Sequence, residues 1–208
     1  MFAGGTFPPE SSAAFRICGI DEAGRGPLAG PVYAAAVILD EGFPVEILDD
    51  SKKMTKSGRE KAAALITGKA AWGIACAEAS EIDAINILRA SLLAMARAWN
   101  ALCASFPAAP PVRAVIDGQY CPCIPIPCEA MVKADAKVPA VMAASILAKT
   151  ARDRMMLRYS WLYPEYGYEK HKGYATKAHR EALARCGPSP IQRHSFSVKP
   201  LQKKFDFS

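Results

Sequence analysis

The sequence predicts an α/β fold built around one mixed β-sheet. Short apolar runs and helical patterns follow one another in the order β-β-α-β-α-β-β-α-α, which combines an opening hairpin with β-α crossovers. The chain has 208 residues, of which 51% are hydrophobic, so it can bury one substantial core. We therefore expect a single domain, with a flexible leader at 1–14 and a basic tail at 188–208.

The first half of the chain supplies strands and helices in alternation. Apolar runs bounded by turn residues predict strands at 15–21, 32–39 and 71–79. Helical spacing of apolar residues predicts helices at 55–68 and 82–105. Thr55 or Ser57 is expected to cap the first helix. Asn86 could sit near a metal site, but we favour a capping role at a break in the second helix.

The second half of the chain follows the same alternation. Strands are expected at 112–117 and 123–132, and helices at 138–157 and 175–185. Pro139 suits the first turn of its helix, because that position needs no backbone N–H. Gly187 suits the end of the last helix. The predicted main domain therefore covers 15–187.

Two aspartates follow buried strands, at positions where ligands commonly bind. Asp21 follows the apolar run 17–20, and Asp117 follows the apolar pair 115–116. Burying a carboxylate is costly unless a cation, a cap or a salt bridge compensates it. In open α/β sheets, ligands bind at the carboxyl ends of the strands. We therefore expect the two side chains to converge, although each taken singly could simply begin a turn.

Glu22 and Asp135 are candidates for the same site. Adjacent residues on a strand point to opposite faces, so Asp21 and Glu22 can share a site only if the strand ends or distorts there. The glycine-rich segment 23–26 favours such an end. Asp135 stands just before a predicted helix, so a capping role is the alternative.

A carboxylate cluster without a paired histidine favours a hard divalent ion. Mg²⁺ and Mn²⁺ prefer oxygen ligands, whereas zinc sites are commonly built with histidine and cysteine. Two such ions can activate water and stabilise the leaving oxygen of a phosphodiester. We therefore expect Mg²⁺ or Mn²⁺ as the cofactor, with two ions during catalysis.

Positive charge is concentrated in the last third of the chain. Residues 1–132 contain 11 basic and 14 acidic residues, whereas residues 133–208 contain 15 and 6. Clustered lysine and arginine neutralise phosphates and release counterions, which favours a polyanionic partner. An ordinary solvated basic surface would give the same counts.

Seven cysteines without a secretory signal indicate a cytoplasmic protein with reduced thiols. The apolar stretches are too short to span a bilayer, so no membrane association is expected. Cys121, Cys123 and Cys128 could bind zinc, but they lack the usual C-x2-C pairs and a nearby histidine. We favour a tight turn there, because prolines alternate with these cysteines.

One long segment and five shorter ones resemble the ribonuclease HII family. The long segment is GIDEAGRGPLAGPVYAAAVIL at 19–39. The others follow in the family's order: DSKKM (50–54), EIDAINIL (81–88), AVIDG (114–118), KADAKVPAVMAASILAKTARD (133–153) and YGYEKHKGYATKAH (166–179). Six blocks in register are far more specific than one short motif.

The resemblance implies a ribonuclease H-like fold, with a five-stranded mixed sheet flanked by helices and a helical C-terminal extension. It implies an endoribonuclease that hydrolyses the RNA strand of RNA–DNA hybrids. It also implies cutting on the 5′ side of single ribonucleotides in duplex DNA, which leaves 3′-hydroxyl and 5′-phosphate ends. The alternatives are a ribonuclease H that needs a run of ribonucleotides, or a non-catalytic nucleic-acid-binding module.

The resemblance also assigns site residues. The family's four metal-binding carboxylates match Asp21, Glu22, Asp117 and Asp135. The loop that senses the ribose 2′-hydroxyl matches Gly24, Arg25 and Gly26, and glycine allows the close backbone approach that this role needs. Tyr174 matches a tyrosine that stacks on the deoxyribose of the next nucleotide. Candidate phosphate contacts, each of which could equally be a plain surface lysine, are Lys53, Lys149 and Lys172, with Lys52 and Lys170 beside them.

One departure from the family lies next to Asp135, where Ala134 stands in place of the usual glycine. If that position required a positive φ, alanine would strain it and shift Asp135. We further expect a monomer. Docking of the tail LQKKFDFS on a sliding clamp is an alternative that we do not favour.

Overall fold

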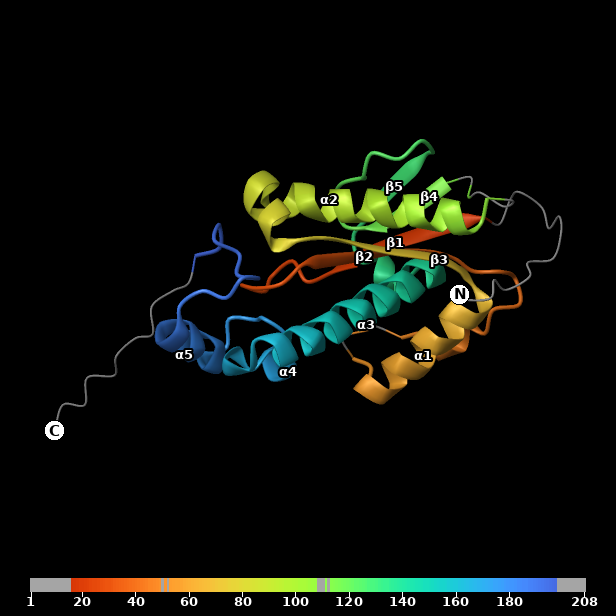
Figure 1. Ribbon diagram of the computed structural model, residues 1–208. Helices are drawn as coiled ribbons and strands as arrows, with labels where there is room; N and C mark the ends of the chain where they lie inside the picture. Colours follow the sequence, from red (N-terminus) through yellow and green to blue (C-terminus); the bar gives the residue numbers. More distant parts are fainter. Residues whose placement is uncertain (1–15, 50, 52, 108–110, 112, 198–208) are drawn as a thin grey trace.

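The computed structural model describes residues 16–49, 51, 53–107, 111 and 113–197. Its centre is a five-stranded sheet in the order β3-β2-β1-β4-β5. Helix α2 covers one face of this sheet, and α3 covers the other with α1 packed beside it (Figure 1). Helices α4 and α5 lie beyond the end of α3. The predicted leader at 1–14 lies outside the described residues.

The sheet is mixed, as predicted. Its strands are β1 (Ile17–Ala23), β2 (Val32–Ile38), β3 (Ala71–Ala77), β4 (Arg113–Asp117) and β5 (Cys128–Met131). The three strands β1, β2 and β3 pair in antiparallel fashion, whereas β1 with β4 and β4 with β5 pair in parallel. The parallel pairs place the carboxyl ends of β1 and β4 at the same edge of the sheet.

The described part of the chain contains five α-helices. They are α1 (Lys56–Lys69), α2 (Ala79–Ser105), α3 (Pro139–Leu162), α4 (Tyr168–His171) and α5 (Lys177–Cys186). Thr55 caps α1 by accepting a hydrogen bond from the N–H of Gly58, and Pro139 begins α3 as predicted. Asn86 has a φ of 68° inside α2, and its side chain accepts from the N–H of Arg89 at 3.1 Å. The predicted break and cap at Asn86 are therefore confirmed.

Both faces of β2 are buried, which explains its continuous apolar sequence. Ala34 and Ala36 pack into the core under α2, whereas Ala35 and Val37 pack into the core under α1 and α3. Helix α3 lies unusually close to β1, because a Cβ atom on Gly19 would come within 2.1 Å of the Ala140 carbonyl carbon. This close packing brings the segment before α3 to the carboxyl end of β1.

Several predicted boundaries are wrong, most of all at β1 and β5; in addition, β3 ends at Ala77 instead of 79 and α2 begins at Ala79 instead of 82. Strand β1 continues through Ala23 instead of ending at 21, since its pairing with β2 extends to Tyr33. Strand β5 spans only Cys128–Met131 rather than 123–132, because prolines at 125 and 127 cannot donate to a neighbouring strand. Helix α3 runs five residues beyond the predicted 157 and ends at Leu162, just before Pro164.

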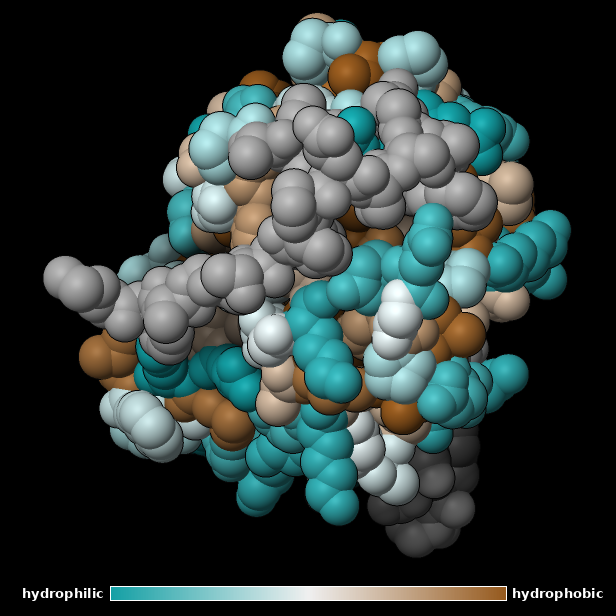
Figure 2. Space-filling view, turned by 90° about the vertical axis from the view of Figure 1, so that its right-hand side faces the viewer, coloured by the Kyte–Doolittle hydropathy of each residue, from teal (hydrophilic) through white to brown (hydrophobic). Residues whose placement is uncertain are grey.

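The surface shown in Figure 2 has hydrophilic side chains around small hydrophobic patches, which is ordinary for a globular protein. Among the described helices, none is both long and apolar enough to cross a membrane.

Candidate metal centre and substrate loop

Three carboxylates converge at the carboxyl ends of β1 and β4. Ile20 pairs with Ile116 across these parallel strands, so Asp21 and Asp117 come next on neighbouring strands. Asp135 joins them from a short 3₁₀ turn at Ala134–Ala136. One carboxylate oxygen from each of the three aspartates lies within 4.8 Å of the others. Such a set of oxygen donors fits Mg²⁺ or Mn²⁺.

A hydrogen bond from the turn at Ala134–Ala136 to Asp117 fixes the position of Asp135. The Oδ1 atom of Asp117 accepts from the N–H of Ala134 at 2.8 Å. Ala134 is fully buried against Val115 and Val141. Residues with positive φ include Lys133, at 59°, but not Ala134. The strain considered for an alanine at this position is therefore absent, and the methyl group anchors the turn.

The structure also defines the roles of Asp135 and Glu22. Asp135 does not cap α3, since that helix begins at Pro139 with Val138 as its N-cap residue. Because β1 continues past Asp21, Glu22 extends from the other face of the strand, yet its charge still acts on Asp21. The carboxylate of Glu22 lies 3.4 Å from the Arg25 guanidinium and stands beside the three aspartates rather than among them.

The electrostatics of the cluster favour a bound cation. Asp21 is only 5% exposed. Burial raises the pKa of Asp21 well above its usual range, and repulsion from Glu22, Asp117 and Asp135 raises it further. Burial also raises the pKa of Glu22, which Arg25 opposes. A divalent ion would remove this penalty, because it favours the charged form of each carboxylate.

The metal-free protein should become more stable when Asp21 is replaced by Asn. A carboxyl group whose folded-state pKa is raised binds its proton more tightly when folded, so its stabilising effect is present at low pH and lost as pH rises through the folded pKa. At pH 8 in a chelator, Asp21→Asn should therefore raise the free energy of unfolding by about 1 kcal/mol or more. Thermal melts should show a rise of about 2–4 °C.

The pH and added Mg²⁺ provide two controls for the stability of Asp21→Asn. The stability gain of Asp21→Asn over wild type should shrink as the pH falls below the raised folded-state pKa of Asp21, because the folded carboxyl is then protonated and uncharged. Added Mg²⁺ should stabilise wild type more than the variant. A variant that melts below wild type at pH 8 without metal would contradict the proposed charge repulsion.

The loop between β1 and β2 is held by a buried arginine from the other end of the chain. Arg193 is fully buried. Its guanidinium donates to four main-chain carbonyl oxygens of the loop: Gly24 at 2.6 Å, Arg25 at 2.9 Å, Pro27 at 2.8 Å and Gly30 at 2.8 Å. Five donors in a rigid fork suit arginine to this task. The segment 188–197, which we assigned to the tail, therefore packs on the predicted substrate loop.

A second buried arginine joins this loop to the segment that carries Tyr174. Arg152 of α3 is 1% exposed and donates to the carbonyls of Ala29, Pro31 and Lys172 at 3.1–3.2 Å. Its guanidinium lies 6.0 Å from the centre of the Tyr174 ring. Gly24 has a φ of +102°, and a Cβ there would meet the Arg152 side chain at 2.0 Å. Glycine is therefore required at this position.

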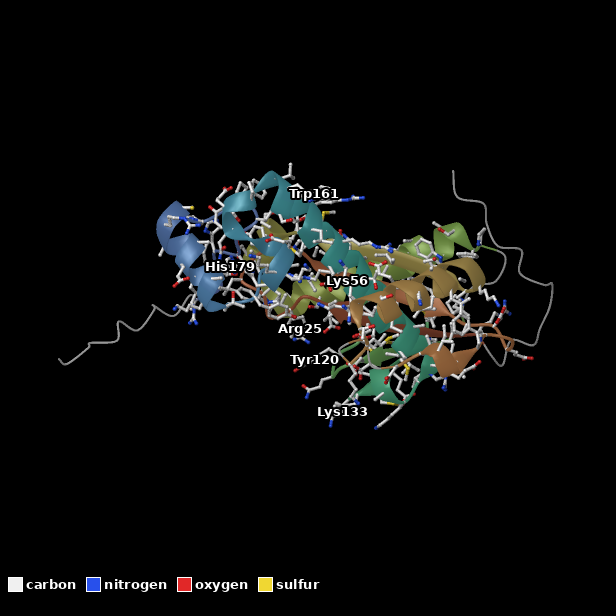
Figure 3. All side chains as sticks on the ribbon, turned by 90° about the horizontal axis from the view of Figure 1, so that it is seen from below. Arg25, Lys56, Tyr120, Lys133, Trp161 and His179 are labelled. Carbon is white, nitrogen blue, oxygen red and sulfur yellow. The ribbon has the colours of Figure 1, made fainter. Side chains whose placement is uncertain are left out.

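The predicted 2′-hydroxyl sensor and the predicted stacking tyrosine lie side by side. A Cβ atom on Gly26 would be 3.8 Å from a ring carbon of Tyr174, and Tyr174 is 45% exposed. The Arg25 side chain is exposed and extends from the same edge of the molecule as Tyr120 and Lys133 (Figure 3). An accessible ring next to a tight glycine turn can contact a sugar closely.

The predicted phosphate-contacting lysines differ in their surroundings. Lys53 is exposed just before α1. Lys149 forms an ion pair with Asp153 at 2.8 Å. Lys172 has a φ of 51°, and its ammonium donates to the carbonyl of Glu169. Lys52 lies outside the described residues.

The cysteine-rich turn shows no metal site. Cys121, Cys123 and Cys128 are free thiols, and within the described residues they belong to no group of potential ligands close enough to share an ion. Burial and the neighbouring Cys121 raise the pKa of Cys128 to about 12, so this thiol stays protonated at neutral pH.

Comparison with known proteins identifies the family. A family model described as ribonuclease HII matches residues 18–199. The chain belongs to the ribonuclease HII family. A ribonuclease HII of Treponema denticola is 54% identical over 201 residues, which cover 89% of this chain and all of that protein. The predicted family is therefore confirmed.

Two solved structures confirm the predicted fold. The ribonuclease H2 of Pyrococcus horikoshii aligns with a TM-score of 0.69 and 27% identity, and the alignment covers 88% of this chain and 94% of that one. A ribonuclease HII from Archaeoglobus fulgidus, solved in complex with PCNA, gives a TM-score of 0.71 at 24% identity, with 90% and 98% covered. Ribonuclease HII enzymes are endoribonucleases of the ribonuclease H family, which act on RNA in hybrids and need divalent metals.

Arg152 and Arg193 were not among the residues that the sequence singled out. A positive charge inside the predicted helix at 138–157 could have indicated a buried arginine. Their acceptors could not have been found, because the bonds of Arg193 to Gly24 and Arg25 join residues 169 and 168 positions apart.

Proposed function

We propose that this ribonuclease HII cuts duplex DNA on the 5′ side of a single embedded ribonucleotide, as well as the RNA strand of hybrids. The supporting observation is that the predicted substrate loop is held in place directly beside the carboxylates. The three aspartates meet near the carboxyl ends of β1 and β4, and the loop that continues from β1 is held against the Tyr174 segment by Arg152. A ribose placed against the loop would therefore lie close to the carboxylates.

The carboxylates would hold two divalent ions, Mg²⁺ or Mn²⁺. Asp21 and Asp117 are the central ligands in this proposal, and Asp135 completes the site from its buried turn. Glu22 supports the side that faces the loop, since its carboxylate is next to Arg25. When bound, the ions would supply Lewis-acid stabilisation of the phosphodiester and an activated water, giving 3′-hydroxyl and 5′-phosphate ends.

The chain's own groups would select the ribose. Arg193 engages the carbonyls of the loop from within the protein, which fixes the backbone that would meet the 2′-hydroxyl, the group that separates RNA from DNA there. Tyr174 would stack on the sugar of the following nucleotide, and a deoxyribose, which lacks the 2′-hydroxyl, would bring its apolar C2′ against the ring. The half-exposed guanidinium of Arg25, which also pairs with Glu22, would contact an adjacent phosphate.

A single substrate tests this proposal. A DNA duplex that carries one ribonucleotide should be cut at the phosphodiester on its 5′ side, with either Mg²⁺ or Mn²⁺, and mapping of the ends should show 3′-hydroxyl and 5′-phosphate. An all-DNA duplex of the same sequence is the control.

Two other outcomes would replace the proposal. Cutting of an RNA–DNA hybrid without cutting at the single ribonucleotide would indicate an enzyme that needs a run of ribonucleotides. Metal-independent binding without hydrolysis of any substrate would indicate a non-catalytic module.

A further inference from the structure

A hollow of about 230 Å³ lies between α1, α3 and the C-terminal end of α4 with the residue that follows it. It is smaller than the roughly 300–1,000 Å³ of pockets that enclose drug-sized ligands, so its size suits a single chemical group. Thr150 and Asp153 of α3 form part of its wall, and Lys56, Lys170 and Lys172 stand around it.

The charge of this hollow is strongly positive. Five basic and two acidic side chains line it, and both carboxylates already have partners. Asp153 binds Lys149 at 2.8 Å and Arg59 at 3.6 Å, and Glu60 binds Arg154. Within the described residues, Lys56, Lys170 and Lys172 form no ion pair with a carboxylate. Their charges are therefore available to an external anion.

These lysines also repel one another. Burial lowers the pKa of Lys172, and the charges of Lys56 and Lys149 lower it further, against the opposing effect of Asp153. A cluster of like charges is unfavourable unless something neutralises it. The ammonium of Lys172 is moreover tied to the carbonyl of Glu169, so it is fixed at the rim of the hollow.

A buried hydroxyl gives an independent indication of a missing partner. Thr150 is 4% exposed, and its hydroxyl has no hydrogen-bond partner in the described protein. A helical threonine commonly donates to a carbonyl one turn earlier, as Thr67 of α1 does to Ala63 at 3.0 Å. Buried polar groups are nearly always satisfied. Thr150 also lines the hollow, so a buried hydroxyl without an acceptor belongs to a wall that carries excess positive charge.

We infer that this hollow binds one phosphate group of the nucleic-acid backbone, with the lysines as cationic contacts and the Thr150 hydroxyl as a donor at its base. This assignment rests on the proposed function, because its location ties it to the substrate loop. Lys172 is two residues from Tyr174, and its carbonyl accepts from Arg152, which also holds the loop.

Binding measurements without catalysis test the site. The metal-free Asp117→Asn protein is titrated with the one-ribonucleotide duplex at several salt concentrations. Lys56→Gln should weaken binding several-fold and reduce the slope of log affinity against log salt by about one. Thr150→Val should weaken binding without lowering the melting temperature, because it removes a hydroxyl that has no partner. Lys69→Gln, at the exposed far end of α1, should bind like the parent.

Three other outcomes of these measurements would lead to different conclusions about the hollow. If Lys56→Gln and Thr150→Val bind the duplex as tightly as Lys69→Gln does, the site is wrong. If inorganic phosphate raises the melting temperature of the parent but not of Thr150→Val, while duplex affinity is unchanged, the hollow takes free phosphate instead. If the variants weaken duplex binding but the wild-type enzyme does not cut at a ribonucleotide, the phosphate site stands and the proposed function fails.

Discussion

Replacing Asp117 with Asn is expected to lower the rate of cleavage by about 10²–10⁴-fold or more, since bound metal supplies several kcal/mol of transition-state stabilisation. Asn is the appropriate replacement because its side-chain oxygen can still accept from the N–H of Ala134, the bond that positions the turn of Asp135. The variant therefore removes one negative charge with little change in shape. Single-turnover cleavage of the one-ribonucleotide duplex measures the loss.

Duplex affinity separates this effect from a folding defect. The dissociation constant of Asp117→Asn for the same duplex should remain close to that of wild type, because Arg25, Tyr174 and the basic surface are unchanged. Asp40→Asn, at an exposed position far from the carboxylates in sequence, is the matched control and should cleave normally. Full retained cleavage by Asp117→Asn would remove this aspartate from the metal centre.

Replacing Arg193 should uncouple ribonucleotide recognition from the metal centre. Arg193→Met would leave four loop carbonyls without their donor, and buried groups left unsatisfied cost about 1–3 kcal/mol each. We expect a loss of several kcal/mol in the free energy of unfolding. Arg193→Lys keeps the charge but offers three donors from one point, so it should fold while holding the loop less rigidly.

The kinetics of Arg193→Lys distinguish a positioning role from a purely structural one. Its kcat on the one-ribonucleotide duplex should fall about tenfold or more, because a small displacement of the ribose weakens catalysis strongly. The change in KM should be smaller, since the phosphate contacts remain. Arg158→Lys, at an exposed position on the same helix as Arg152, is the control. Equal activity of Arg193→Lys and wild type would show that the loop needs no such clamp.

Local sequence patterns were sufficient for most of the fold. The apolar runs before Asp21 and Asp117 predicted two strands that end at one site, and both are present as β1 and β4. Caps at Thr55 and Asn86 were also predicted correctly. These features depend on hydrogen bonds and side-chain spacing within a few residues, which the sequence displays directly.

The geometry of the site depended on contacts that the sequence does not display. The extension of β1 to Ala23 comes from its pairing with β2, and that pairing places Glu22 beside the three aspartates instead of among them. The turn that carries Asp135 is fixed by the distant Asp117 rather than by the helix that follows. Tertiary contacts therefore decided where β1 ends and how the turn of Asp135 is positioned.

The sequence by itself determined the order of the elements and the family, and it predicted the carboxylates of the site. Only the tertiary structure decided how the loop at 24–30 is held, because the donors come from Arg152 and Arg193, more than 120 residues away. A buried guanidinium is stable only where several acceptors converge on it. That convergence exists only once the chain has folded.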